Sequence, residues 1–448
     1  MVVRIILKQT DMRYTIKIFL LAALTALTAG MLSCKKNNGS GYNPAAPIVV
    51  DSFTATSGGV GTEVLISGSN FSPDTSQVKV FINGHQLALV GGNGRQIMAV
   101  VPARCGSGNV IVKIGKDSGV SKGIFNYTFS RIVSTLAGDG NAGFANGKGT
   151  DAEFNFNGQN WYRSMGVVVD DNLNVYVADP GNHCIRKIDS LGNVSTLAGE
   201  AGVSGYSDGQ GSNAHFSLPY DLALDGDGNI WSVDPGNWDI RKISPDGTAV
   251  TWAWGSQAPW SVSVDKTSGY VYYSSCDPSG NIYQVSAQWT TNQVIPGLKY
   301  PAGIRFDKAG NLYVSGSGDH VIYKFDAGTW NKSVIAGTMG SAGYVNGVGT
   351  AAQFANPWGI ALDGSGNILV AGNGTWDGGT YNPDQSVRMV QAGTWAVTTF
   401  AGNGAAGYAD GIGEGAAFSA PTGVAVDKNG TVYVLDKNNN RIRKIISQ

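Results

Sequence analysis

Residues 423–445 read GVAVDKNGTVYVLDKNNNRIRKI, and this stretch decides the fold because five earlier segments repeat its pattern. Each copy holds an apolar strand, a turn rich in Asp, Gly and Asn, a second strand, a loop and a third strand. The earlier copies begin at Gly166, Asp221, Ser261, Gly303 and Gly359. Six copies in register predict six equivalent structural units.

The strands of these units are short and apolar. Hydrophobic runs of about five residues indicate that both strand faces are buried between neighbouring units, and Asp-x-x-Gly-Asn elements supply hairpin turns. One unit cannot bury itself, whereas six units closed into a ring leave only short, protected edges. The 64 glycines among 448 residues agree with a chain that turns often. We therefore predict an all-β protein whose larger part is a six-bladed β-propeller.

The strand count also predicts how the ring closes. A fourth strand follows most third strands, as in VSTLAG at residues 194–199, but the sixth unit ends at Gln448 without one. The same six letters, VSTLAG, stand alone at residues 133–138, before the first unit. We expect this N-terminal strand to complete the last blade.

Two regions of the chain resemble known families. The six copies resemble NHL repeats, and the resemblance covers residues 131–448. Residues 47–129 resemble the IPT/TIG domain, because Gly61 and Thr62 open a strand and residues 68–71 match the G-x-N-F turn of that family. The second resemblance implies an immunoglobulin-like β-sandwich ahead of the propeller, of a kind that generally acts as a spacer or adhesive module.

The N-terminus carries the features of an export signal. Basic residues precede an apolar run at residues 18–29, which suits a signal-peptide core and is short for a membrane span. Residues 31–36, MLSCKK, resemble the lipobox of bacterial lipoproteins, which implies a signal peptide at 1–33, lipidation of Cys34 and a flexible tether at 34–46. An ordinary secretory signal is the alternative. The resulting expectation is a lipid-anchored protein of the bacterial cell envelope, at the periplasmic or surface side of the outer membrane.

Composition narrows the partners. Charged residues make up 14% of the chain and nearly cancel to −1, so no basic field favours nucleic acid as a partner. Beyond Cys34, the cysteines at positions 105, 184 and 276 have spacings that suggest neither a disulfide framework nor a zinc site.

Four loops that lead into a unit share the form G-Y/F-x-x-G-x-G-x-x-A-x-F. They are residues 143–154, 205–216, 343–354 and 407–418. In an up-and-down propeller, these loops and the loops after the second strands lie on one face, which is the default binding face. We expect their final Phe to pack inward, since a phosphate cradle would need a helix N-terminus. Units three and four are entered by short segments, so this face should be walled on one side only.

Candidate ligand-binding residues on this face are aromatic residues and histidines. Tyr220, Trp260 and Trp358 occupy equivalent positions before first strands, and their flat rings suit stacking on the apolar face of a sugar. An insertion in the fifth unit, at residues 375–385, carries two further candidates, Trp376 and Tyr381. The loops after the second strands add His183, Trp238 and His320. The alternative is that these side chains pack between blades.

A metal site is a weaker prediction. Asp179, Asp234 and Asp436 end the second strands of three units, and propeller lactonases, to which the repeats are similar in fold, hold a divalent ion with carboxylates in comparable loops. The competing interpretation is that the three carboxylates cap turns. No cofactor is predicted, although a divalent ion such as calcium is an alternative. No Ser-His-Asp or Cys-His arrangement is evident, so no catalytic residue is predicted.

These observations favour a binding protein over an enzyme. The expected function is capture of a glycan or an envelope protein by the loop-bearing face of a lipid-anchored propeller. Two alternatives stay open: a metal-dependent hydrolase or lyase of the propeller lactonase type, and a structural scaffold of the envelope.

Overall fold

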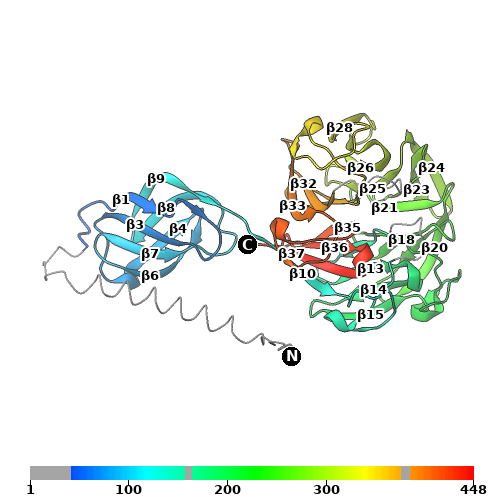
Figure 1. Ribbon diagram of the computed structural model, residues 1–448, viewed down its shortest axis with the longest axis horizontal. Coiled ribbons are helices and arrows are strands. Elements are labelled where there is room, and N and C mark those ends of the chain that lie inside the picture. Colours follow the sequence, from blue (N-terminus) through cyan, green and yellow to red (C-terminus); the bar gives the residue numbers. More distant parts are fainter. Residues whose placement is uncertain (1–41, 157–163, 375–383) are drawn as a thin grey trace, which may run out of the picture. The chain divides into compact units, whose positions relative to one another are not determined.

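The computed structural model describes residues 42–156, 164–374 and 384–448 of the chain. Within them the regular secondary structure consists of β-strands and three-residue 3-10 turns, which confirms the predicted all-β class. Two compact units are present, Met1–Thr128 and Phe129–Gln448 (Figure 1). Among the described residues, no helix has the length and hydropathy needed to cross a membrane.

The first unit is the predicted β-sandwich. One sheet has the order β1 (Val49–Thr54), β3 (Glu63–Ser69), β7 (Gln96–Val100), β6 (Ala88–Gly92). The other has the order β2 (Ser57–Gly58), β9 (Asp117–Tyr127), β8 (Gly108–Ile114), β4 (Val78–Ile82), β5 (His85–Gln86). Alternate residues of each strand face the core, as Val64 and Ile66 of β3 do with no exposed surface.

The second unit contains the six predicted blades, each an antiparallel sheet. Blade 1 comprises β12 (Val167–Val169), β13 (Val175–Asp179), β14 (Cys184–Ile188) and β15 (Asn193–Ala198). Blade 2 comprises β17 (Asp221–Leu224), β18 (Ile230–Asp234), β19 (Asp239–Ile243) and β20 (Thr248–Trp254). Blade 3 comprises β21 (Pro259–Val264), β22 (Val271–Ser275), β23 (Gly280–Ala287) and β24 (Thr290–Leu298).

The remaining three blades follow the same plan. Blade 4 comprises β25 (Pro301–Phe306), β26 (Leu312–Gly316), β27 (Val321–Phe325) and β28 (Lys332–Ala336). Blade 5 comprises β30 (Pro357–Leu362), β31 (Ile368–Gly372), β32 (Gln385–Val390) and β33 (Ala396–Gly404). Blade 6 comprises β35 (Pro421–Val426), β36 (Val432–Asp436), β37 (Arg441–Ser447) and β10 (Arg131–Ala137).

The core lies between the blades, because each blade is apolar on both faces. Successive first strands touch one another around the ring, and β12 contacts both β17 and β35. One buried cluster joins Val175 and Val177 of blade 1 with Tyr433 and Leu435 of blade 6. A blade therefore depends on its neighbours for burial, as the sequence pattern predicts.

The ring closes as expected, by a strand from the start of the unit. β10 pairs antiparallel with β37, from Arg131 opposite Ser447 to Ala137 opposite Ile442. Two backbone hydrogen bonds between Ser130 and Gln448, of 2.8 and 3.0 Å, continue the pairing. Blade 6 is thus built from both ends of the unit.

The long entering loops protect blade edges. Each adds a two-residue strand to the outer edge of the blade that it precedes: β11 (Gly147–Lys148), β16 (Gly209–Gln210), β29 (Gly347–Val348) and β34 (Gly411–Ile412). The Phe that ends each loop is fully buried, as predicted: Phe154, Phe216, Phe354 and Phe418. Blades 3 and 4, which follow short connections, have four-stranded sheets without this addition.

Candidate functional site

Each long loop is held on the propeller by a buried arginine of the third strand. The four arginines have no exposed side-chain surface: Arg186, Arg241, Arg388 and Arg443. In blade 6 the guanidinium carbon of Arg443 lies 4.8 and 5.2 Å from the ring centroids of Tyr408 and Phe418, the aromatic residues of the entering loop. Arg443 also donates hydrogen bonds to the carbonyl oxygens of Ala409 (2.8 Å) and Ala417 (3.0 Å). The other three repeat this arrangement.

The three aspartates predicted as metal ligands bind the buried arginines or the backbone of the entering loops. Asp436 accepts a hydrogen bond from Nη1 of Arg443 at 2.8 Å and one from the backbone N–H of Ser419 at 2.7 Å. Asp179 pairs with Arg186 at 2.8 Å, and Asp234 accepts backbone N–H groups of the loop that enters blade 2. They lie in three separate blades. Within the described ranges, no group of three or more His, Cys, Asp or Glu side chains could hold a metal ion. The geometry thus gives these carboxylates a loop-anchoring role.

In blade 5 the carboxylate beside the buried arginine comes from a different sequence position. Its second strand ends in Gly372 where blades 1, 2 and 6 have Asp. The carboxylate comes instead from Asp384, which accepts the N–H of Ala355 at 3.1 Å and lies 3.6 Å from Nη1 of Arg388. A Cβ at Gly372 would lie 2.6 Å from Oδ1 of Asp384, so glycine makes room for the substitute.

Blades 3 and 4 lack both the arginine and the loop. Their third strands carry Tyr283 and Tyr323 at the arginine position, as the strand register shows, and the hydroxyl of Tyr323 donates to Asp319 at 2.7 Å. The Asp–Arg pair therefore accompanies the long loops. A sequence signal for it exists in the seven-residue spacing of Asp179 and Arg186, which recurs in blades 2 and 6.

Blade 2 contains one buried carboxyl outside this scheme. Asp239, the first residue of β19, has no exposed surface, and neither of its side-chain oxygens has a hydrogen-bond partner in the described part of the chain. Burial raises the pKa of Asp239 to about 8, and the charge of Asp234 adds to the rise, while Arg241 at 3.8 Å opposes it. Asp239 therefore titrates near neutral pH in the folded protein.

This titration predicts a pH-dependent stability. Between about pH 4 and about pH 8 the folded state retains a proton on Asp239 that the unfolded chain has released, so stability falls as the pH rises through this window. Asp239→Asn removes this dependence of stability on pH, because the amide does not titrate. Asn is the residue that blade 3 has at the same repeat position, Asn281. When the pH is raised from 5.5 to 7.5, the unfolding free energy of the variant should rise by about 2 kcal/mol relative to that of the wild type. Urea titrations at the two pH values measure this difference. Parallel pH profiles of the two proteins would contradict this assignment.

The predicted aromatic trio comes together but is largely inaccessible. Ring centroids of Trp260 lie 5.3 Å from Tyr220 and 6.3 Å from Trp358, and all three belong to one core cluster. Tyr220 and Trp358 have no exposed surface, and Trp260 is partly buried. A sugar can stack only on an accessible ring, so in this conformation Trp260 alone of the three offers surface.

The loops after the second strands contain the other candidates. His183, Trp238 and His320 share a repeat position with left-handed backbone (φ of 58°, 60° and 60°). His183 donates through Nδ1 to the carbonyl oxygen of Ser217, and His320 accepts the N–H of Asn356 at 3.3 Å, so both histidines contact the loop entering the next blade. Trp238 precedes a blade without a long loop. Its side chain is 52% exposed, and no partner for its ring is present among the described residues.

Two further aromatic residues lie near Trp238. The N–H of Gly255 donates to the carbonyl oxygen of Trp238 at 2.8 Å, which brings the end of β20 beside it. Trp254, 46% exposed, packs on Tyr206, 47% exposed, with ring centroids 5.1 Å apart. We name Tyr206, Trp238 and Trp254 the blade-2 aromatic cluster. It lies on blade 2, the last blade with a long entering loop before blades 3 and 4, which have none. The sequence pattern singled out Trp238 but not the other two.

Three sequence-based candidates lie outside the described residues. These are Trp376 and Tyr381 of the fifth-blade insertion and Cys34, the expected lipidation site.

Comparisons with known proteins agree with the fold. The NHL repeat model matches residues 166–188 and 418–445, and the IPT/TIG domain model matches residues 47–129. The chain is 28% identical over 326 residues to Protein SUPPRESSOR OF QUENCHING 1, chloroplastic, of Arabidopsis thaliana, which covers 70% of this chain and 27% of that protein. The chain thus spans about a quarter of that relative's length.

Solved structures from Bacteroides match most of the chain. A Bacteroides thetaiotaomicron protein of unknown function has a TM-score of 0.61 at 20% identity, covering 91% of this chain and 100% of its own. An auxiliary nutrient binding protein of Bacteroides ovatus has a TM-score of 0.58 at 22% identity, with the same coverage. At these identities the likeness demonstrates a shared fold.

Proposed function

Because the chain carries an IPT/TIG domain followed by a six-bladed propeller with NHL repeats, we propose that it captures a glycan nutrient through the loop face of the propeller. A binding role fits the nutrient-binding description of the structural neighbour from Bacteroides ovatus. The blade-2 aromatic cluster supports this proposal most strongly.

The cluster has the properties of a sugar-stacking platform. The rings of Tyr206 and Trp254, each roughly half exposed, pack on each other, and the carbonyl oxygen of the 52% exposed Trp238 accepts the backbone N–H of Gly255, the residue that follows Trp254. A pyranose packs its apolar face on such rings and needs hydrogen-bonding groups at its edge. Glu200 and His215, which pair at 3.1 Å with exposed fractions of 51% and 29%, supply polar groups from the same entering loop.

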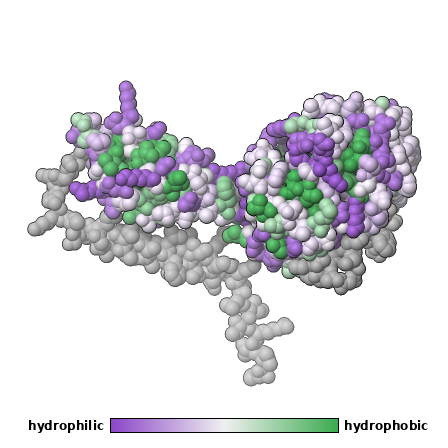
Figure 2. Space-filling view, turned by 90° about the horizontal axis from the view of Figure 1, so that it is seen from above, coloured by the Kyte–Doolittle hydropathy of each residue, from purple (hydrophilic) through white to green (hydrophobic). Residues whose placement is uncertain are grey.

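The propeller surface also offers a control position for the cluster. Figure 2 shows apolar residues on the viewed surface of the propeller in patches separated by polar residues. Exposed aromatic residues elsewhere in the propeller include Trp289, in the turn between the third and fourth strands of blade 3, 55% exposed. Such a turn lies on the opposite face from the loops after second strands, so Trp289 provides a matched control for exposure and residue type.

We expect Trp238→Ala and Trp254→Ala each to weaken glycan binding by about tenfold or more, since truncation removes a stacking ring. A soluble form that begins at Lys35 is first screened on a glycan array, and the best ligand is then titrated calorimetrically against each variant. Trp289→Ala should bind as the wild type does. Equal losses in all three variants, or no glycan bound at all, would contradict the proposal; the second outcome would favour an envelope protein as the ligand.

We further propose that the protein is lipid-anchored through Cys34 in the cell envelope, with residues 34–46 as a tether. The lipobox-like residues 31–36 motivate this proposal. Metabolic labelling with an alkyne fatty acid should mark the wild type and leave Cys34→Ala unmarked. Labelling that persists in the variant would overturn the anchor.

A further inference from the structure

A recess lies on the propeller face opposite the long loops. This face carries the turns between first and second strands, and we name it the hairpin face. The central channel widens there into a cavity of about 240 Å³, lined by first-strand residues of all six blades. Most of the residues that line it are apolar, with Val168, Leu224, Phe306, Leu362 and Val426 as partly exposed members. We name this cavity the vestibule.

Arg305, one of the residues that line the vestibule, forms an ion pair across the channel. Arg305 of blade 4 donates from Nη1 and Nη2 to the two carboxylate oxygens of Asp221 in blade 2, at 3.1 and 3.2 Å. Ser261 of blade 3 also donates to Asp221, at 2.6 Å. Asp221 is fully buried, so side chains of three of the six blades form a polar network beside the vestibule.

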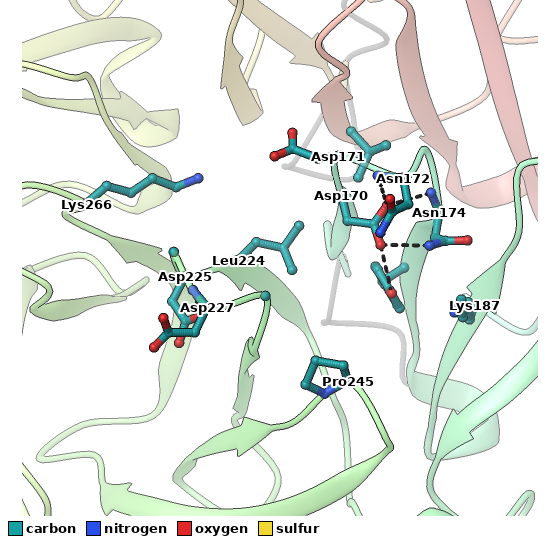
Figure 3. Close-up of a pocket in the computed structure, with 14 residues that line it drawn as sticks. Asp170, Asp171, Asn172, Asn174, Lys187, Leu224, Asp225, Asp227, Pro245 and Lys266 are labelled. Atoms are coloured by element: carbon teal, nitrogen blue, oxygen red, sulfur yellow. Dashed lines mark hydrogen bonds between the residues drawn. The ribbon is translucent and has the colours of Figure 1, made fainter.

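A polar arm extends from the vestibule between the hairpins of blades 1 and 2. This cavity, of about 460 Å³, shares Val169, Leu224 and Lys266 with the vestibule, so the two are adjacent. In Figure 3, Asp171 and Lys266 reach toward the recess from different sides, with Leu224 between them. The vestibule and the arm therefore place mostly apolar side chains beside mostly polar ones.

The arm contains polar groups that the fold itself does not use. Asp170 caps its hairpin, accepting the N–H groups of Asn172 and Asn174 at 2.9 and 2.8 Å. The adjacent Asp171 and, in the blade-2 hairpin, Asp227 are exposed, and neither carboxylate accepts a hydrogen bond in the described residues. Both signs of charge line the arm. A neutral, hydroxyl-rich group suits it, because carboxylates accept from hydroxyls and ammonium groups donate to them, whereas a charged ligand would meet like charge.

We propose that this recess binds an amphipathic glycoside, with its alkyl or aryl group in the vestibule and its sugar in the polar arm. The vestibule volume of about 240 Å³ suits a short alkyl chain or one aromatic ring. The site is separate from the blade-2 aromatic cluster and does not rest on the function proposed above.

The test uses octyl β-glucoside below its micellar concentration, titrated calorimetrically against the soluble protein, with glucose for comparison. Glucose should bind at least about tenfold more weakly, because it lacks the apolar group. Leu224→Asn and Lys266→Ala should each weaken octyl glucoside binding by about tenfold. Leu191→Asn, on a side chain 72% exposed in a hairpin turn of blade 1, and Trp238→Ala should leave it unchanged.

The variants separate the possible outcomes. If Leu224→Asn does not fold, the exposed Lys266→Ala decides the result. Binding that neither variant alters, binding lost in Trp238→Ala, equal affinity for glucose, or no binding of octyl glucoside would each overturn the site. Loss of glycan binding at the loop face with retained octyl glucoside binding would contradict only the proposed function.

Discussion

A chain from which residues 131–138 are deleted is expected to lose the cooperative unfolding of its propeller. These residues include β10, whose pairing with β37 completes blade 6 and contributes Val133 and Ala137 to the core, 1% and 0% exposed. Without them β37 becomes an unpaired edge, and the packing between blades 6 and 1 is opened. The loss should be comparable to the whole unfolding free energy of a domain, about 5–15 kcal/mol. Thermal unfolding followed by near-ultraviolet circular dichroism measures it.

A rearranged chain provides the matched control. Because Ser130 and Gln448 are hydrogen-bonded neighbours, the deleted strand can be attached after Gln448 through the blade-1 turn, residues 189–192, which joins β14 to β15. This chain has the same strand in the same place and should regain a cooperative transition. An unchanged melting temperature in the deletion, or no recovery in the rearranged chain, would show that β10 does not close the ring.

Arg443→Leu is expected to destabilise the propeller by about 3–5 kcal/mol, the usual cost of removing one partner of a buried ion pair. Asp436 and Arg443 both have no exposed side-chain surface, so the variant leaves a buried carboxylate without its counter-charge. It also removes the donors to Ala409 and Ala417, which hold the loop at residues 407–418. Urea unfolding at constant pH gives the free energy change.

The double variant Asp436→Asn, Arg443→Leu distinguishes an orphaned charge from lost packing. It removes both charges and should be less destabilised than Arg443→Leu alone. Lys444→Leu, at a partly exposed neighbouring position, should change stability by less than about 1 kcal/mol. A cost for Arg443→Leu as small as that for Lys444→Leu would refute the anchoring role of the arginine.

The repeat pattern in the sequence predicts most of the fold. Strand order, blade number and the closure by residues 131–138 all follow from local patterns that recur in register, and each is present in the structure. The inward packing of Phe154 and its three equivalents was also predictable, since a recurring spacing within the loops placed one apolar residue at each loop end.

The site was less predictable because exposure depends on neighbouring blades. Tyr220 and Trp358 occupy the repeat position expected at the channel opening, yet packing across the channel buries both. Trp238 is exposed, and the loop that follows it is short. The sequence indicated this short loop and an open face beside blades 3 and 4. Tyr206 was hidden within the loop consensus, and Trp254 belongs to a strand whose end the repeat alignment did not define. Neither position distinguishes an exposed ring from a buried one without the fold.

The central claim is that glycan binding occurs at the blade-2 aromatic cluster. The most direct measurement is the indole N–H spectrum of the protein labelled with nitrogen-15 at its 11 tryptophans, recorded during glycan titration. We expect the signals of Trp238 and Trp254, assigned by substitution, to shift in proportion to occupancy, while those of Trp289 and the buried Trp358 stay in place. Saturable binding that leaves the signals of Trp238 and Trp254 unmoved would contradict the claim.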